Sequence, residues 1–159
     1  EFRLHVLNEF LERIRSTLYR QTMFADFEHQ AHSIVGEGGA LTPDKLDELY
    51  HGLKSEYYEP AVMDERIGRE WMRIPHFYRS FYVYQYATGI SAAVALADRV
   101  LNKGEEAAQD YLNFLRSGSS KYSLDLLKDA GVDMSSPEPI ESAISVYSDY
   151  LDEMEAIIE

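Results

Sequence analysis

Apolar residues near the N-terminus recur at spacings of three and four from Phe2 to Ile34. This is the stripe of an amphipathic helix. The glycines of the segment 36–39 follow it, and glycine commonly ends helices because it adopts left-handed backbone angles without strain. The pattern therefore predicts one long first helix.

The rest of the chain predicts further helices and no strand, because no segment alternates apolar and polar positions. Thr42 and Pro43 provide a cap and a first-turn proline for a helix to about Tyr57. The remaining helices are expected over about 64–71, 77–102, 105–116, 123–131 and 137–158. We predict an all-α fold, a multi-helix bundle of about six or seven helices, with residues 1–159 forming a single domain.

The predicted central helix, 77–102, contains the uncharged stretch 80–97. Such a stretch is typical either of a membrane span or of a helix buried in a bundle, and its polar residues favour the buried helix. At 100° per residue, Phe77, Phe81 and Tyr84 share one face. The aromatic rings predict either core packing or the wall of a cleft with hydroxyl groups turned toward a ligand.

Acidic residues outnumber basic ones, with 28 Asp and Glu against 15 Lys and Arg, for a net charge of −13. Binding to nucleic acid or to an anionic membrane surface needs a basic face, so we expect neither partner. The chain has no cysteine, which excludes disulfides and thiolate chemistry and fits a cytoplasmic location. It begins at Glu1 without Met or a helix cap, so we expect a piece of a longer protein.

Two places carry histidines that are candidates for chemistry. His29 and His32 lie three residues apart beside Glu28, whereas a zinc helix of the HExxH type needs histidines four apart. This segment therefore predicts a solvated polar face, with an accessory metal site as the alternative. His76 follows Pro75 at the start of the predicted central helix. From the residues alone, His76 is either a structural hydrogen-bonding group or a catalytic one.

The block Arg73–Gly89, with the sequence RIPHFYRSFYVYQYATG, resembles a segment near the C-terminus of oligoendopeptidase F, a zinc oligopeptidase related to thimet oligopeptidase. The similarity extends upstream to residues 19–28. Downstream it includes residues 117–120 and 130–134, with similar spacing. It therefore covers nearly the whole chain.

The resemblance implies that residues 1–159 are the helical C-terminal portion of a zinc metalloendopeptidase that hydrolyses short peptides. No HExxH motif occurs here, so zinc and its ligands are expected in the upstream catalytic portion, with no metal held by this piece. His76 and Tyr84 are then the predicted catalytic donors to the oxyanion. The predicted substrate-binding residues are Tyr78, Tyr82, Phe77 and Phe81. The piece alone is expected to be inactive.

A hypothesis of another class stays open at this stage. Phe77, Phe81 and Tyr84 could form an aromatic groove that binds an amphipathic partner helix, which would make the chain a non-enzymatic interaction module. An HExxH motif upstream of Glu1 would decide for the enzyme.

Overall fold

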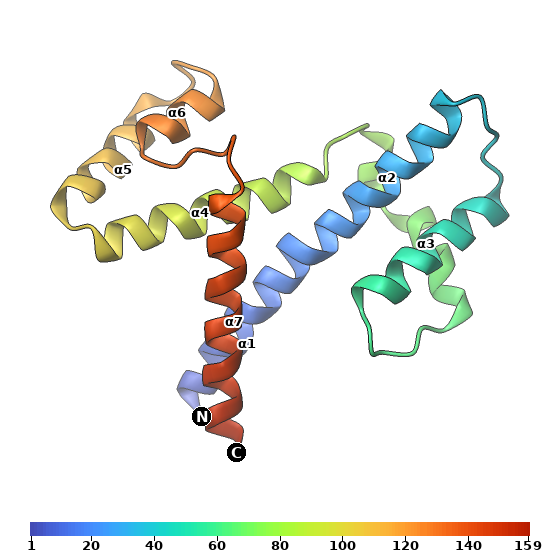
Figure 1. The fold of residues 1–159 in the computed structure, drawn as a ribbon, viewed down its shortest axis with the longest axis horizontal. Coiled ribbons are helices and arrows are strands. Elements are labelled where there is room, and N and C mark those ends of the chain that lie inside the picture. The colour runs from blue at the N-terminus through green and yellow to red at the C-terminus, as the bar shows by residue number, and fades with distance from the viewer. The chain divides into compact units, whose positions relative to one another are not determined.

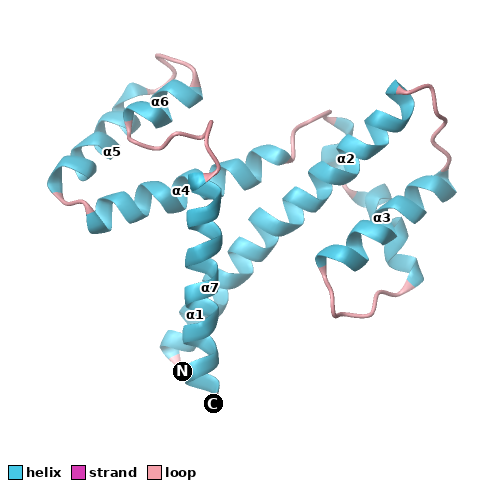
Figure 2. Ribbon diagram, in the orientation of Figure 1, coloured by secondary structure: helices cyan, strands magenta, loops and turns pink.

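A computed structural model describes residues 1–159, and it consists of helices, turns and loops without a strand (Figures 1 and 2). The predicted all-α fold is confirmed. The seven α-helices are α1 (Phe2–Ile14), α2 (Arg20–Gly36), α3 (Pro43–Tyr57), α4 (Tyr84–Asn102), α5 (Glu105–Ser117), α6 (Ser123–Asp129) and α7 (Glu138–Ile158). Two short 3₁₀ helices, η2 (Glu65–Arg73) and η3 (Pro75–Tyr78), lie between α3 and α4.

The backbone is helical without interruption from α1 to α2, through a π-helical segment, η1 (Arg15–Tyr19). This confirms the long first helix. It ends where the N–H of Glu37 donates to the carbonyl of Ser33 and Gly38 takes a positive φ of 86°. Contacts divide the chain into two compact units, Arg15–Ala87 and the combination of Glu1–Ile14 with Thr88–Glu159, which are described separately.

The unit Arg15–Ala87 has an aromatic core in which α2, α3 and the segment after α3 meet. Phe27 is its centre, with ring centroids 5.2 Å from Tyr50, 5.1 Å from Phe77 and 6.4 Å from Trp71. Helix α3 begins as predicted, because the Thr42 hydroxyl accepts a hydrogen bond from the N–H of Lys45 at 3.2 Å. The fully buried members of this core are Met23, Tyr50 and Val83.

Helix η2 packs closely on α3, and one glycine makes this approach possible. A Cβ atom at Gly68 would lie 2.9 Å from the carbonyl oxygen of Asp47. The Asp47 carboxylate accepts hydrogen bonds from the Trp71 indole at 2.8 Å and from the Arg69 guanidinium at 3.2 Å. Residues 68–71 of η2 are therefore attached to α3.

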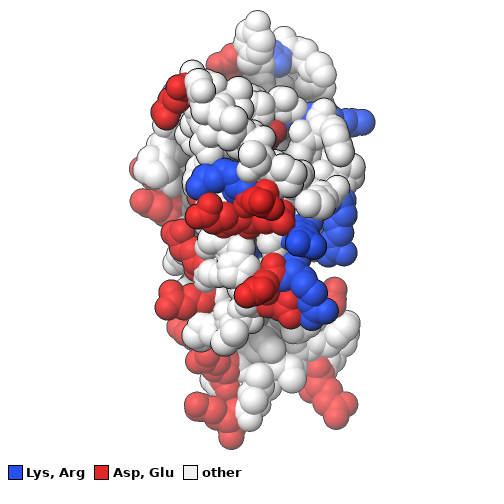
Figure 3. Space-filling view, turned by 90° about the vertical axis from the view of Figure 1, so that its right-hand side faces the viewer, with Lys and Arg blue, Asp and Glu red and all other residues white.

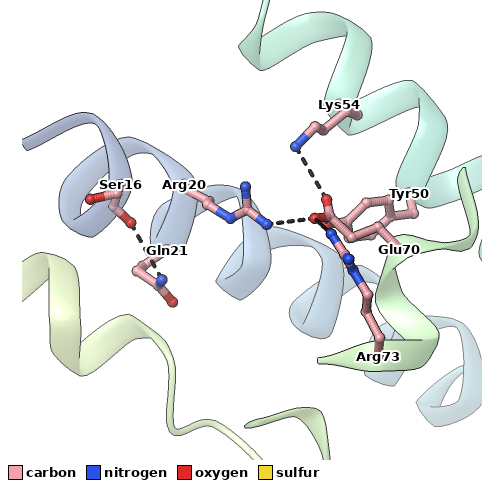
Figure 4. Close-up of polar contacts among 7 residues, drawn as sticks. All are labelled: Ser16, Arg20, Gln21, Tyr50, Lys54, Glu70 and Arg73. Carbon is pink, nitrogen blue, oxygen red and sulfur yellow. Dashed lines mark hydrogen bonds and ion pairs between the residues drawn. The ribbon is translucent and has the colours of Figure 1, made fainter. Parts of the chain in front are cut away.

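A buried carboxylate, Glu70, ties η2 to α2 and α3 (Figure 4). One oxygen accepts from Arg20 at 2.6 Å and Arg73 at 3.0 Å, and the other accepts from Tyr50 at 2.8 Å and Lys54 at 3.2 Å. Burial by itself would raise the pKa of Glu70, but these hydrogen bonds and cationic charges outweigh burial and lower the pKa to about 2. A buried acid with this many donors keeps its charge without the cost of an unpaired ion.

Outside this cluster, basic and acidic groups also lie side by side. Figure 3 shows Lys and Arg side chains next to Asp and Glu side chains in the middle of one face. Pairs in the unit Arg15–Ala87 include Arg66 with Asp64 at 2.7 Å and Lys45 with Glu48 at 3.0 Å. Both pairs are exposed, so each contributes little to stability.

The unit formed by Glu1–Ile14 and Thr88–Glu159 contains α1, most of α4, and α5 to α7. Helices α1 and α7 pack together, with the Phe10 and Tyr150 rings edge to face at 5.0 Å and Arg3 paired with Glu153 at 2.5 Å. Small residues of α4 and rings of α5 line an apolar cavity of about 610 Å³. Its lining is Gly89, Ala92, Ala93, Leu96, Ala97, Val100, Leu101, Tyr111, Phe114 and Leu127.

The helix that the sequence predicts over 77–102 begins only at Tyr84, so the prediction was wrong for residues 77–83. Residues 75–78 form η3, and turns follow to residue 81, where Phe81 has a positive φ of 59°. A continuous helix cannot pass through a residue in this left-handed conformation. Phe77 and Phe81 therefore do not share a helix face with Tyr84. None of the helices combines the length and the apolar character that a bilayer-spanning segment requires.

Candidate functional site

The predicted site residue His76 lies in a small aromatic group that we call the His76 cluster, formed by His76, Tyr82 and Tyr86. The imidazole stacks on the Tyr82 ring, with centroids 5.8 Å apart and planes inclined by 11°. The Tyr86 ring meets the imidazole edge to face at 5.8 Å, and its hydroxyl lies 3.4 Å from Nε2 of His76. The cluster thus places an imidazole and two phenols together.

Local sequence explains where His76 sits. Ile74, which precedes a proline, is extended with φ −91° and ψ 99°, as pre-proline residues generally are. Pro75 then begins the single turn η3. Phe77 directly follows His76, and its ring packs in the core against Phe24 at 5.6 Å and Phe27 at 5.1 Å. His76 is half-buried beside this anchored ring.

The two tyrosines of the cluster, Tyr82 and Tyr86, come after the turn that follows η3. Phe81 donates its backbone N–H to the Glu28 carboxylate at 2.7 Å, and its ring lies 4.7 Å from the His32 ring. Tyr82 follows Phe81, and Val83 is completely buried in the core. Tyr86 lies in the first turn of α4, and the neighbouring Tyr82 hydroxyl raises the pKa of Tyr86.

A cavity of about 220 Å³ opens beside Phe77 and Tyr78. Its walls are mainly aromatic and aliphatic, with Glu28 and His32 as polar groups. The full lining is Phe27, Glu28, Ala31, His32, Leu46, Trp71, Met72, Ile74, Phe77 and Tyr78. A concave apolar wall with few polar groups is the usual setting for binding an apolar side chain.

The predicted site residues occupy different positions around these features. Tyr78 is 85% exposed, and Tyr84, the first residue of α4, is 50% exposed. Tyr82 contacts His76, while Phe77 is anchored in the core and Phe81 packs on His32. Sequence reasoning did not select Tyr86 as a site residue. The available signal was its position four residues after Tyr82 in the aromatic block.

Comparison with known proteins places the chain in a family. A family model described as peptidase family M3 matches residues 3–146. The chain belongs to peptidase family M3. The resemblance to oligoendopeptidase F seen in the sequence is confirmed as well, because relatives of that name match nearly the whole of this chain.

Oligopeptidase PepF of Bacillus subtilis is 52% identical over 157 residues, which are 98% of this chain and 23% of that protein. The plasmid-encoded oligoendopeptidase F of Lactococcus lactis subsp. cremoris is 42% identical over 158 residues, 99% of this chain and 26% of that protein. The chain thus spans about a quarter of the length of these relatives.

Two crystal structures have the same fold. Oligoendopeptidase-F from Enterococcus faecium matches with a TM-score of 0.95 and 46% identity, over 99% of this chain and 30% of that one. A putative peptidase from Chlamydophila abortus matches with a TM-score of 0.87 and 42% identity, over 95% of this chain and 26% of that one.

The zinc that the family resemblance implies finds no ligand set among residues 1–159. No group of three or more His, Asp or Glu side chains is placed to hold a metal ion. In the segment 28–32, Glu28 accepts the Phe81 N–H and the His32 ring packs on Phe81. Residues 1–159 therefore do not fit a zinc site.

Proposed function

We propose that the whole protein containing this chain is a zinc-dependent endopeptidase of short peptides, for which residues 1–159 supply the helical C-terminal portion. Membership in peptidase family M3 and relatives named oligoendopeptidase F support this proposal. The metal ligands and the general base belong, in this proposal, to residues outside 1–159. We place the protein in the cytoplasm.

Hydrolysis of a peptide bond creates negative charge on the carbonyl oxygen, and donors fixed in place before the reaction stabilise that charge. His76 and Tyr84 are the proposed donors from this chain. An imidazole N–H and a phenol O–H both provide the required proton, and neither residue is fully buried. The observation that supports His76 is its place beside the Tyr82 and Tyr86 rings, and Tyr84 is proposed because of the family resemblance and its exposed position at the start of α4.

The remaining predicted site residues are assigned to substrate binding. Tyr78 and Phe77 line the 220 Å³ cavity, which has room for an apolar side chain of a peptide. Phe81 packs on His32, which lies in the same lining, and Tyr82 holds the imidazole of His76 by stacking. Peptide groups passing this surface would meet rings for packing and hydroxyls for hydrogen bonding.

The test compares His76→Ala and Tyr84→Phe in the intact protein, with peptide hydrolysis as the readout. Loss of one oxyanion donor should lower kcat by about 10²–10³-fold with a much smaller change in KM. His5→Ala and Tyr122→Phe are matched controls, because both residues are exposed and lie outside the unit Arg15–Ala87. Full activity of both site variants would refute these two assignments.

The same preparation tests the metal requirement. Removal of metal by a chelator should abolish hydrolysis, and added zinc should restore it. An intact protein that hydrolyses peptides equally well after complete metal removal would contradict the zinc-dependent part of the proposal.

A further inference from the structure

Glu28 and His32 hold Phe81 from one face of α2. The Glu28 carboxylate accepts the Phe81 backbone N–H at 2.7 Å, and the His32 ring lies 4.7 Å from the Phe81 ring. The two residues are four apart, a spacing that brings side chains to the same helix face. Glu28 and His32, which the sequence predicted to belong to a solvated polar face, therefore both contact Phe81.

Phe81 needs such a partner because of its backbone. It is the one residue other than glycine with a positive φ, at 59°. Bulky side chains rarely adopt this left-handed conformation, and it persists where surrounding contacts determine it. Glu28 is itself 5% exposed, so its carboxylate is placed in the interior and directed at this N–H.

The turn at Phe81 decides where Tyr82 points. Val83, on the other side of Tyr82, is completely buried in the aromatic core. Tyr82 thus lies between a residue held by Glu28 and a residue held by the core, and in that position its ring stacks on His76 at 5.8 Å. If Phe81 changed to ordinary helical angles, the direction of Tyr82 would change with it.

We propose that Glu28 is a positioning residue of the His76 cluster. By accepting the Phe81 N–H it holds the left-handed turn, and the turn keeps Tyr82 stacked on His76. Its effect on catalysis rests on the proposed function, whereas its effect on the turn does not.

The kinetic test is a double-mutant cycle in the intact protein with Glu28→Ala and Phe81→Gly. Glu28→Ala should lower kcat by about three- to tenfold, as much as loss of the Tyr82 ring would, with a smaller change in KM, because the stacking on His76 is lost. Glycine adopts the left-handed conformation without strain, so Glu28→Ala should cost little in a protein that already carries Phe81→Gly. Equal effects of Glu28→Ala in both backgrounds would overturn the proposal.

Two further variants separate positioning from general destabilisation. Glu28→Gln keeps an oxygen that accepts the Phe81 N–H, so it should restore most of the lost kcat. Glu37→Ala, at an exposed acid beyond the end of α2, is the matched control and should leave kcat unchanged. An inactive Glu28→Gln protein that unfolds like the wild type would count against a role through this hydrogen bond.

A second readout does not depend on hydrolysis. Hydrogen exchange at the Phe81 amide should accelerate in Glu28→Ala and stay slow in Glu28→Gln, because only the first removes the acceptor. Unchanged protection in Glu28→Ala would overturn the positioning role. If His76→Ala and Tyr84→Phe keep full turnover while the exchange result holds, the proposed function fails and the structural role of Glu28 stands.

Discussion

The imidazole of His76 stacks on the phenol ring of Tyr82, with planes only 11° apart. On a continuous helix, residues six positions apart point in directions that differ by about 120°. The rings meet because the backbone leaves helical geometry after η3 and passes through the left-handed residue Phe81. The contact therefore depends on the interruption of the helix.

This stacking gives the first prediction. Tyr82→Leu should lower kcat of the intact protein about three- to tenfold, since an aromatic pair contributes about 0.5–1.5 kcal/mol. Tyr82→Phe keeps the ring and should retain most of the activity. Steady-state kinetics on both variants, with the exposed Tyr122→Leu as control, checks this. A Phe variant as impaired as the Leu variant would show that the hydroxyl acts rather than the ring.

Glu70 predicts an acid-dependent loss of stability. Its pKa is about 2 in the folded chain against 4.5 for the free group, so the folded state favours the charged form. Its contribution is complete above about pH 4.5 and disappears as the pH falls toward 2, for a total of about 3 kcal/mol.

The measurement is urea unfolding of the wild type and Glu70→Gln between pH 6 and pH 2, followed by Trp71 fluorescence. The difference in free energy of unfolding should shrink by about 3 kcal/mol as the pH falls. The exposed Glu48→Gln is the control and should not change with pH in this way. A constant difference for Glu70→Gln would contradict the lowered pKa.

Gly68 predicts a packing defect on substitution. Gly68→Ala places Cβ 2.9 Å from the Asp47 carbonyl, so η2 must move away from α3, at a cost of about 1–3 kcal/mol. Gly52→Ala is the matched control within α3, where an added Cβ has no neighbour within 4 Å. It should stabilise by about 0.5–1 kcal/mol. Thermal unfolding in which both variants behave alike would contradict the close approach at Gly68.

The absence of a metal ligand set predicts that residues 1–159 alone bind no zinc. Residues 1–159 purified and incubated with zinc should retain no stoichiometric metal after dialysis, because no three ligating side chains converge. The same sample should hydrolyse no peptide. One tightly bound zinc per chain, measured by mass spectrometry, would show that the ligand set lies here after all.

Rules that depend only on neighbouring residues, such as apolar spacing and helix capping, predicted several helices correctly. The long first helix follows from apolar spacing, and the start of α3 follows from Thr42 and Pro43. The break before α4 was missed, because the acceptor that holds Phe81 lies 53 positions away, at Glu28. Composition and periodicity describe neighbours along the chain, and they contain no information about such a distant partner.

In the candidate site, too, features set by neighbouring residues could be predicted, whereas contacts between distant residues could not. His76 could be selected from its place after Pro75 within the aromatic block, but its contact with Tyr86 depends on the turn between them. The Glu70 cluster was also missed, since Arg20 and Glu70 lie 50 positions apart and meet only when α2 and η2 pack together.

The left-handed turn at Phe81 has a consequence for protein engineering. A peptide or graft that copies residues 76–86 alone would carry every ring of the His76 cluster but lack the Glu28 and His32 side chains that hold Phe81. Transplanting the arrangement into another scaffold therefore requires a second helix with an acid and a ring at matching positions, so the smallest portable unit is a pair of segments.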